Sequence, residues 1–454
     1  MERVVIRHIR LRLRTPFVTA LGAEDQRDII IVEVHGEGHI GYGEVPVMAK
    51  PVYNEETVVT AWHVLNDFFV AAVLEGRVAH PFDAARLLSV YHGHAMAKAG
   101  LEGAVWDLWA RRRGLPLSRA LGGFQRRVPA GVAVGFAETT DELLRRVEAY
   151  LGQGYRRIKV KIEPGRDADV VAAVRRRFPA INLAADANGS YRWADADALR
   201  RLDKFGMSML EQPLPREDLL GHARLQKVLQ TPICLDESIS SVRHAQQALA
   251  LGSGRMFNIK APRLGGLTEA LAVHDEAVAA GVPVWCGGML ETGIGRAHNV
   301  ALASLPGFTL PGDLSASERY WVEDIVHPPF ALDEEGFIPV PDGPGIGVEV
   351  DRDRLEALTV RQRVHGRPKE AARSEPGSGG RRRGTGAMRK SRPRRPELGA
   401  GTAAGSLFSL KKFIAQRSWT STDGNAARRR HHRGIHGSRK RGTWRCIALH
   451  RRAQ

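Results

Sequence analysis

The sequence predicts an α/β protein that consists of a (β/α)₈-type barrel, an N-terminal α+β capping domain completed by a C-terminal segment, and a disordered basic tail. Charged residues end five successive short apolar runs at an almost constant spacing, which predicts the barrel. An alternating, turn-rich pattern precedes these runs and predicts the capping domain. A sharp change in composition near residue 365 predicts the tail.

The five charged residues define the barrel. They are Lys161, Asp186, Glu211, Asp236 and Lys260, separated by 25, 25, 25 and 24 residues. Each interval holds one apolar run and one helical pattern, which is the length of a βα unit. Functional residues of such barrels lie at the C-terminal ends of the strands, so we expect the five side chains to meet at one face.

The residue types indicate a chemistry. Three carboxylates that converge on one point repel one another, and a hard divalent cation with oxygen ligands, such as Mg²⁺, relieves that repulsion. Lys161 and Lys260 stand before and after the three acids, so in a closed barrel they face each other across the bound group. Lys159 shares a strand face with Lys161 and is expected to lower its pKa by like-charge proximity. A neutral lysine can take a proton near pH 7.

A structural interpretation competes with the functional one. A single carboxylate at a strand end is most often a helix cap or a solvated loop residue. Five charged residues in register, each where barrels hold their chemistry, favour the functional interpretation.

Residues 1–125 are expected to form the capping domain. Strand patterns of an antiparallel meander occur at 3–13, 28–34 and 40–44. A helical pattern covers 55–123 and is clearest at 97–113. The loop at 15–22 carries Phe17, which either packs on its own sheet or belongs to a lid over a bound ligand.

Residues 126–325 are expected to form the barrel, and residues 326–364 a segment that returns to the capping domain. The expected elements are a first strand at 128–134, a first helix at 140–151, a seventh strand at 283–286 and an eighth strand at 307–310. Gly287, Gly288 and Gly293 follow the seventh strand, which suggests close backbone approach to a ligand, with a plain flexible turn as the alternative.

Charge separates residues 365–454 from the rest of the chain. The full chain of 454 residues has a net charge of +17, but residues 365–454 contain 24 Lys/Arg and 4 Asp/Glu. The remainder contains 43 Lys/Arg and 46 Asp/Glu, a net charge of −3. The basic segment shows no sustained apolar periodicity, so we expect it to be disordered and to resemble an arbitrary extension. Its arginines also suggest nucleic-acid binding, which would be non-specific and salt-sensitive.

The remaining composition indicates a cytoplasmic protein without a membrane partner. Cys234, Cys286 and Cys446 are too few and too scattered for a disulfide framework or a zinc site. No signal peptide opens the sequence, and no apolar run is expected to span a bilayer.

The motifs around these charged residues resemble those of the enolase superfamily. The chain is most similar to its muconate-lactonizing subgroup, within the o-succinylbenzoate synthase / N-acylamino acid racemase family. The motifs that carry the resemblance are Lys159-Val160-Lys161, Asp186-Ala187-Asn188, Glu211-Gln212-Pro213, Asp236-Glu237-Ser238, Asn258-Ile259-Lys260, Trp285 to Gly293 and Pro311 to Ser317. The resemblance covers about residues 1–360, and Ala133 departs from it because similar proteins often have a serine there.

The resemblance implies a set of roles. Lys161 and Lys260 are the expected catalytic residues, with Lys161 as the base and Lys260 as the cation on the opposite face. The expected ligands of Mg²⁺, which Mn²⁺ could replace, are Asp186, Glu211 and Asp236. The expected supporting residues are Lys159, Asn188 and Glu237, and the expected substrate-binding residues are Phe17, Met289, Leu290 and Ser315.

The resemblance also implies the reaction. The expected activity is dehydration of 2-succinyl-6-hydroxy-2,4-cyclohexadiene-1-carboxylate to o-succinylbenzoate, by removal of an α-proton through an enediolate. N-acylamino acid (N-succinylamino acid) racemisation at the same site is the alternative, and the sequence leaves it open. The expected partners are a small-molecule carboxylate and further copies of the same chain.

Overall fold

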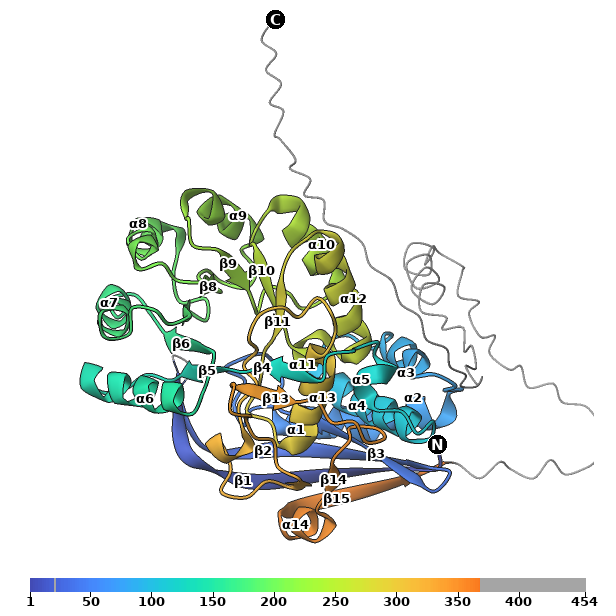
Figure 1. The fold of residues 1–454 in the computed structure, drawn as a ribbon. Helices are drawn as coiled ribbons and strands as arrows, with labels where there is room; N and C mark the ends of the chain where they lie inside the picture. The colour runs from blue at the N-terminus through green and yellow to red at the C-terminus, as the bar shows by residue number, and fades with distance from the viewer. Residues whose placement is uncertain (20–21, 368–454) are drawn as a thin grey trace, which may run out of the picture. The chain divides into compact units, whose positions relative to one another are not determined.

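A four-stranded antiparallel sheet forms the base of the capping domain (Figure 1). The computed structural model describes residues 1–19 and 22–367. The sheet has the order β15-β1-β2-β3. Its strands are β1 (Arg3–Thr19), β2 (Gly22–Gly36), β3 (His39–Val45) and β15 (Thr359–Gly366). The three N-terminal strands confirm the predicted meander, whereas β15 was not predicted.

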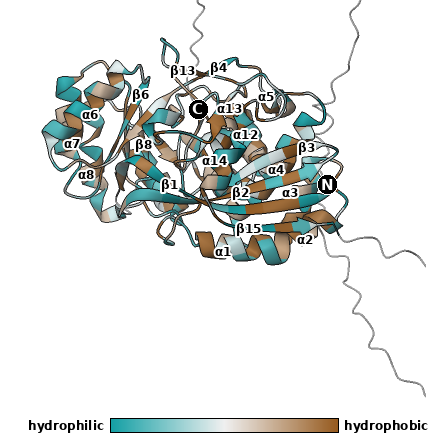
Figure 2. Cartoon of the chain, turned by 90° about the horizontal axis from the view of Figure 1, so that it is seen from below, coloured by the Kyte–Doolittle hydropathy of each residue, from teal (hydrophilic) through white to brown (hydrophobic). Residues whose placement is uncertain are grey.

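Helices cover one face of this sheet and close a hydrophobic core against it. They are α1 (Val58–Val64), η1 (Leu65–Phe69), α2 (Val70–Glu75), α3 (Pro81–Leu88), α4 (Ala95–Arg111) and α5 (Leu117–Ala120). Ile6, Ile30 and Val32 of the strands share this core with Phe69 and Leu101 of the helices. The colouring of Figure 2 shows hydrophobic residues on both the strands and the helices.

The continuous helix from α1 to α2 differs from the expectation that no apolar run could span a bilayer. Val58–Glu75 has 18 residues and a mean hydropathy of 1.4, which suffices by length and composition alone. Half of it is buried inside the protein, where its apolar side chains belong to the core of the capping domain. A buried core helix meets the same length and hydropathy limits, so these two values do not identify a membrane span.

A curled parallel sheet forms the barrel, with strand order β11-β10-β9-β8-β7-β6-β5. Its strands are β5 (Gly131–Val134), β6 (Arg157–Lys161), β7 (Leu183–Asp186), β8 (Met209–Glu211), β9 (Ile233–Leu235), β10 (Met256–Ile259) and β11 (Val284–Cys286). The main outer helices are α6 (Thr140–Gly152), α7 (Ala168–Arg177), α9 (Leu219–Val228), α10 (Val242–Leu251), α12 (Leu267–Ala279) and α13 (Gly293–Ala303). The shorter helical pieces are η2 (Trp193–Asp195), α8 (Ala196–Arg200), η3 (Asp203–Phe205) and α11 (Ala261–Leu264). The predicted combination of a barrel and an α+β cap is thereby confirmed.

The eighth strand of the barrel is reduced in the described residues. Residues 307–310, expected as a strand, contribute a single parallel bridge between Phe308 and Val284. A second single bridge joins Gly312 to Ala130 on the other side of the gap. The chain therefore closes the barrel by isolated bridges and single backbone hydrogen bonds instead of a continuous strand, and Pro311, which has no backbone donor, lies between the two bridges.

The C-terminal segment joins both domains. Its elements are η4 (Ser317–Arg319), β12 (Val326–His327), β13 (Phe337–Pro339), β14 (Glu349–Val350) and α14 (Arg352–Ala357). β13 pairs with β4 (Arg127–Pro129) at the start of the barrel, so residues 337–339 do not pack on the capping domain as expected. Residues around Gly345 do contact the capping domain, since Leu117 donates to the Gly345 carbonyl at 2.6 Å. The last strand, β15, extends two residues past the expected limit at 364, and Gly366 pairs with Arg3.

Residues 368–454 lie outside the described residues. The predicted disorder of the basic tail and its suggested nucleic-acid binding both fall there.

Two glycines of β3 set the approach of α4. A Cβ atom on Gly43 would overlap the Gly100 carbonyl oxygen and lie 2.7 Å from the Ala104 nitrogen, and Gly41 meets α4 in the same way. Backbone atoms cannot move aside as a flexible side chain can, so only glycine fits at these positions.

We predict that Gly43→Ala lowers the stability of the protein by about 2 kcal/mol, because it overpacks the contact between β3 and α4. Thermal unfolding should show a melting temperature lower by about 4 °C. Gly152→Ala is the matched control, since a Cβ atom there has open space within 4 Å. Equal melting temperatures for the two variants would contradict the prediction.

Candidate active site

The five charged residues of the sequence pattern meet at the C-terminal end of the barrel strands. Lys161, Asp186 and Glu211 end β6, β7 and β8, and they stand in register across the sheet. Asp236 and Lys260 directly follow β9 and β10. All five side chains are buried, with Lys161 the most exposed at 9%.

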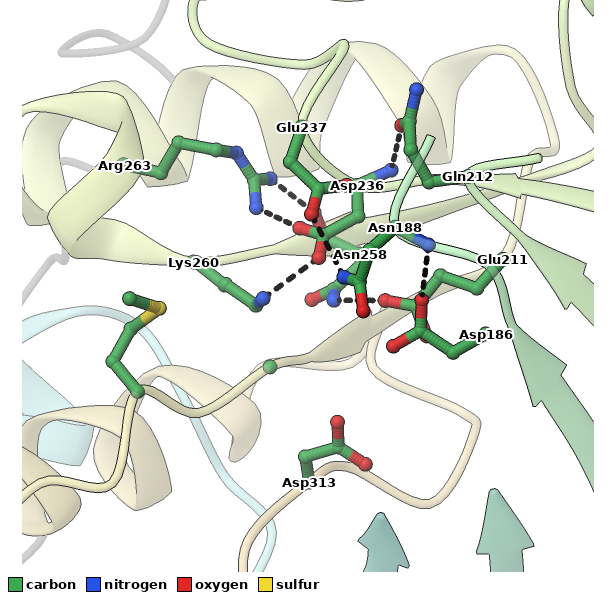
Figure 3. A network of polar contacts seen from close by, with 12 residues as sticks. Asp186, Asn188, Glu211, Gln212, Asp236, Glu237, Asn258, Lys260, Arg263 and Asp313 are labelled. Carbon is green, nitrogen blue, oxygen red and sulfur yellow. Dashed lines mark hydrogen bonds and ion pairs between the residues drawn. The ribbon is translucent and has the colours of Figure 1, made fainter. Parts of the chain in front are cut away.

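Each carboxylate is paired with a cation, and Figure 3 shows the pairs that Asp236 forms with Lys260 and Arg263. Asp186 Oδ2 accepts from Lys161 Nζ at 2.7 Å. Glu211 Oε2 accepts from Lys159 Nζ at 2.6 Å. Asp236 accepts from Lys260 Nζ at 2.7 Å and also from Arg263, whose role in the site the sequence did not indicate.

Lys159 is held as a cation among three carboxylates, those of Asp186, Glu211 and Asp313. Its Nζ donates to Asp313 Oδ2 at 2.7 Å as well as to Glu211. Burial opposes the charged form, but the carboxylates of Asp313, Glu211 and Asp186 outweigh it and raise the pKa of Lys159 well above its usual value. Lys159 is therefore a charged neighbour of Lys161, and its expected effect on that lysine stays a prediction.

The donor set suits a hard divalent cation. Burial raises the pKa of Glu211 to about 8, and the negative charges of Asp186 and Asp236 act in the same direction. Among the described residues, no three acidic, His or Cys side chains lie close enough to share an ion as they stand, because each acid is turned toward its lysine or arginine. Two buried oxygens near the acids, Asn258 Oδ1 and Glu237 Oε2, have no hydrogen-bond partner among the described residues. Oxygen donors, burial and mutual repulsion together fit Mg²⁺.

Strained backbone surrounds the acids. Asn188 and Gln212 follow Asp186 and Glu211 by two residues and one residue, with φ values of 43° and 38°. Asn188 Oδ1 accepts from Lys161 Nζ at 2.6 Å, and its Nδ2 donates to Glu237 Oε1 at 3.1 Å. Non-glycine residues hold such angles only where the surrounding contacts fix them. Asn188 and Glu237 thus lie where the sequence placed them, beside the charged cluster.

A cavity of about 440 Å³ opens above the cluster. Lys161, Lys260 and Asp186 line its floor, and the cavity wall includes three of the expected substrate-binding residues, Phe17, Met289 and Leu290. Ser315 does not line this cavity, and its expected role in substrate binding stays a prediction. Its side chain is buried, and its Oγ accepts from Arg319 Nη1 at 3.2 Å. Ala133 lines the cavity without a polar side chain.

The described residues of the expected loop, 15–19 and 22, belong to the paired strands β1 and β2, and β1 reaches the barrel. The described part of β1 continues to Thr19, and Phe136 after β5 donates to the Val18 carbonyl at 3.0 Å. Phe17 lies 5.8 Å from the Arg319 guanidinium. Phe17 thus belongs to β1 and also lines the cavity, and its role in a lid over a ligand stays a prediction.

Several cavity residues were not identified from the sequence. Tyr53 lies on the loop after β3 and its Oη is 3.5 Å from Lys260 Nζ. Arg27 of β2 is buried and donates to the Met289 carbonyl at 3.1 Å. Asp313 belongs to the motif Pro311 to Ser317 that carried the family resemblance, but the sequence indicated no role for it. Tyr53 and Arg27 come from the other domain, and nothing in the local sequence indicates that they reach the site.

Comparison with known proteins agrees with this geometry. Residues 1–122 match the mandelate racemase / muconate lactonizing enzyme N-terminal domain, and residues 142–354 match the enolase C-terminal domain-like family. An o-succinylbenzoate synthase of Geobacillus stearothermophilus is 51% identical over 360 residues, which are 79% of this chain and 96% of the relative. An N-succinylamino acid racemase of Thermus thermophilus is 46% identical over 363 residues, 80% of this chain and 98% of the relative.

A solved structure shows the same fold. The crystal structure of an enolase superfamily member from Listeria innocua has a TM-score of 0.78 and 39% sequence identity, and the match covers 80% of this chain and 98% of that chain. The chain is thus an enzyme, and it belongs to the muconate-lactonizing subgroup of the enolase superfamily, in the family of the o-succinylbenzoate synthases and N-acylamino acid racemases.

Proposed function

We propose that the protein dehydrates 2-succinyl-6-hydroxy-2,4-cyclohexadiene-1-carboxylate to o-succinylbenzoate, with Mg²⁺ as its cofactor. The observation that carries the proposal is a pair of buried lysines, Lys161 and Lys260, which line one cavity from different strands. Asp186 lines the same cavity, and the buried Glu211 and Asp236 supply further oxygen donors. Relatives at 51% and 50% identity are named o-succinylbenzoate synthases, which supports this substrate.

Asp186, Glu211 and Asp236 would hold the cation. Mg²⁺ would stabilise the negative charge that develops on the substrate carboxylate when the α-proton leaves. Mn²⁺ also prefers oxygen donors and would substitute for it. Asn188 and Glu237 would support the ligands, since they connect to Lys161 and to each other through hydrogen bonds.

The lysines would divide the work. Lys161 would remove the α-proton as a neutral amine and, once protonated, give that proton to the departing hydroxyl group. Lys260 would remain an ammonium and stabilise the enediolate from the opposite face. Asp236 supports this role, because its carboxylate helps to raise the pKa of Lys260 well above the usual value despite burial.

Racemisation of N-succinylamino acids is a second activity that the same site supports. Two lysines on one cavity give one proton-transfer group for each face of the α-carbon. Relatives from Thermus thermophilus and Amycolatopsis, each 46% identical, are named N-succinylamino acid racemases. Assays of both reactions on the purified chain test the proposal, and the ratio of the two kcat/KM values shows which substrate the site prefers. Absence of both activities with Mg²⁺ present would refute it.

The setting of the enzyme is proposed on the same basis. The substrate is a small carboxylate, and we propose that the reaction takes place in the cytoplasm. We also propose a homo-oligomer, which the exposed apolar side chains of Val59, Phe68 and Val364 on the capping domain support. Light scattering would measure its mass.

We predict that the affinity for Mg²⁺ rises with pH. The protonated carboxyl of Glu211, with its pKa near 8, competes with a cation, so affinity increases up to about tenfold per unit below pH 8 and levels off above it. Calorimetric titration at pH 6.5, 7.5 and 8.5 measures this dependence. Glu211→Gln should stay folded but lose both this pH dependence and turnover. Full activity in that variant, or in excess chelator, would contradict the assignment.

We predict different effects for the two lysines. Lys161→Ala should lower dehydration and racemisation by about 10³-fold, because it removes the base. Lys260→Ala should abolish racemisation and reduce dehydration through loss of a cation. Exchange of the α-proton with deuterium from the solvent separates the roles, since only loss of the base stops the exchange. Lys227→Ala, an exposed lysine on α9, is the control. Exchange at the wild-type rate in Lys161→Ala would show that the roles are assigned wrongly.

A further inference from the structure

Asp313 is a fixed carboxylate of the site that the proposed reaction does not use. It lies at the position of the eighth strand, where its backbone nitrogen donates to the Cys286 carbonyl at 2.9 Å. The preceding Gly312 donates to the Pro129 carbonyl at 3.1 Å and accepts from Gly131 at 2.6 Å. The backbone is therefore held from both sides of the barrel closure, and the Asp313 side chain lines the cavity. Figure 3 shows it on a loop apart from the other acids.

Both oxygens of Asp313 bind interior cations. Oδ1 accepts from Arg157 Nη2, and Oδ2 accepts from Lys159 Nζ at 2.7 Å. Lys159 is 2% exposed and also donates to Glu211 Oε2 at 2.6 Å. Lys159 Nζ also lies 3.4 Å from Asp186 Oδ2, so one ammonium group is shared among Asp186, Glu211 and Asp313. Of these three carboxylates, Asp313 is the one outside the proposed cation ligands.

Glu211 has no free oxygen in this arrangement. Its Oε2 accepts from Lys159, and its Oε1 accepts from Asn258 Nδ2 at 2.9 Å. A cation at Glu211 therefore competes with Lys159 for the same oxygen. A buried ammonium that loses its partner is costly, so Lys159 can release Glu211 only if another carboxylate stays beside it. Asp186 also lies beside Lys159, but it is itself a proposed ligand of the cation. Asp313 is therefore the neighbour that can stay with Lys159, and it is anchored by Arg157 as well as by Lys159.

We propose that Asp313 is a positioning residue that retains Lys159 and thereby frees Glu211 to bind the divalent cation. The inference rests on the proposed cation site, but it does not depend on which substrate the enzyme uses. Asp313, at the closure of the barrel, would thus affect cation binding although it is not one of the three proposed ligands.

Calorimetric titration of the full chain with MgCl₂, without substrate, tests the inference. Asp313→Asn keeps the shape of the side chain and removes its charge, so Lys159 should hold Glu211 more tightly and Mg²⁺ affinity should fall at least about fivefold. In a Lys159→Met background the same change should alter the affinity less than about twofold, because the competitor is gone. Asp353→Asn, which removes an exposed carboxylate on α14 outside the cavity lining, is the matched control and should leave the affinity unchanged.

The outcomes separate the inference from the proposed function. A wild-type chain that binds no Mg²⁺ would refute the cation site itself. A wild-type chain that binds Mg²⁺, together with wild-type affinity in Asp313→Asn or equal losses in both backgrounds, would overturn the role of Asp313. If Asp313→Asn does not fold, Lys159→Met tests the competition between Lys159 and Mg²⁺ on which the inference rests. At least about fivefold tighter Mg²⁺ binding in that variant supports the inference, and affinity at or below wild type overturns it.

Discussion

The site depends on the balance of buried charge at the mouth of the barrel. Five carboxylates, Asp186, Glu211, Asp236, Glu237 and Asp313, lie among the cations Arg157, Lys159, Lys161, Lys260 and Arg263. Isolated charges of this kind would cost several kcal/mol each, so each must keep a partner. These ion pairs hold the side chains in place. A divalent cation that binds the acids must therefore replace some of the lysine contacts.

The same balance explains how the two lysines differ from ordinary surface lysines. Burial alone would drive Lys260 toward the neutral form, whereas neighbouring carboxylates favour its ammonium form. For Lys260, Asp236 and other polar neighbours decide the outcome in favour of the cation. Lys161 has Asp186 and Asn188 as partners and the charged Lys159 beside it on the same strand. A difference in surroundings therefore accompanies the proposed difference in role.

The capping domain is held to the barrel by buried carboxylates at helix N-termini. Glu44 of β3 accepts from the backbone nitrogens of Thr292 at 3.1 Å and Gly295 at 2.9 Å, at the start of α13. Glu102 of α4 accepts from the nitrogen of Leu267 at 2.6 Å, at the start of α12. The unpaired N–H groups of a first helical turn favour such acceptors. These contacts join β3 and α4 of the capping domain to α13 and α12 of the barrel, and residues of the capping domain complete the cavity.

The sequence by itself determined the barrel, its α+β cap and the five charged positions at the strand ends. It could do so because a βα unit has a nearly fixed length, and because the C-terminal end of a strand is where a polar side chain is tolerated in a buried sheet. The tertiary structure alone decided the rest. It paired Lys159 with Asp313, brought Tyr53 and Arg27 into the cavity, buried Ser315 and added β15 to the first sheet. Those contacts join residues far apart in the chain, and no local pattern encodes a partner that only packing brings near.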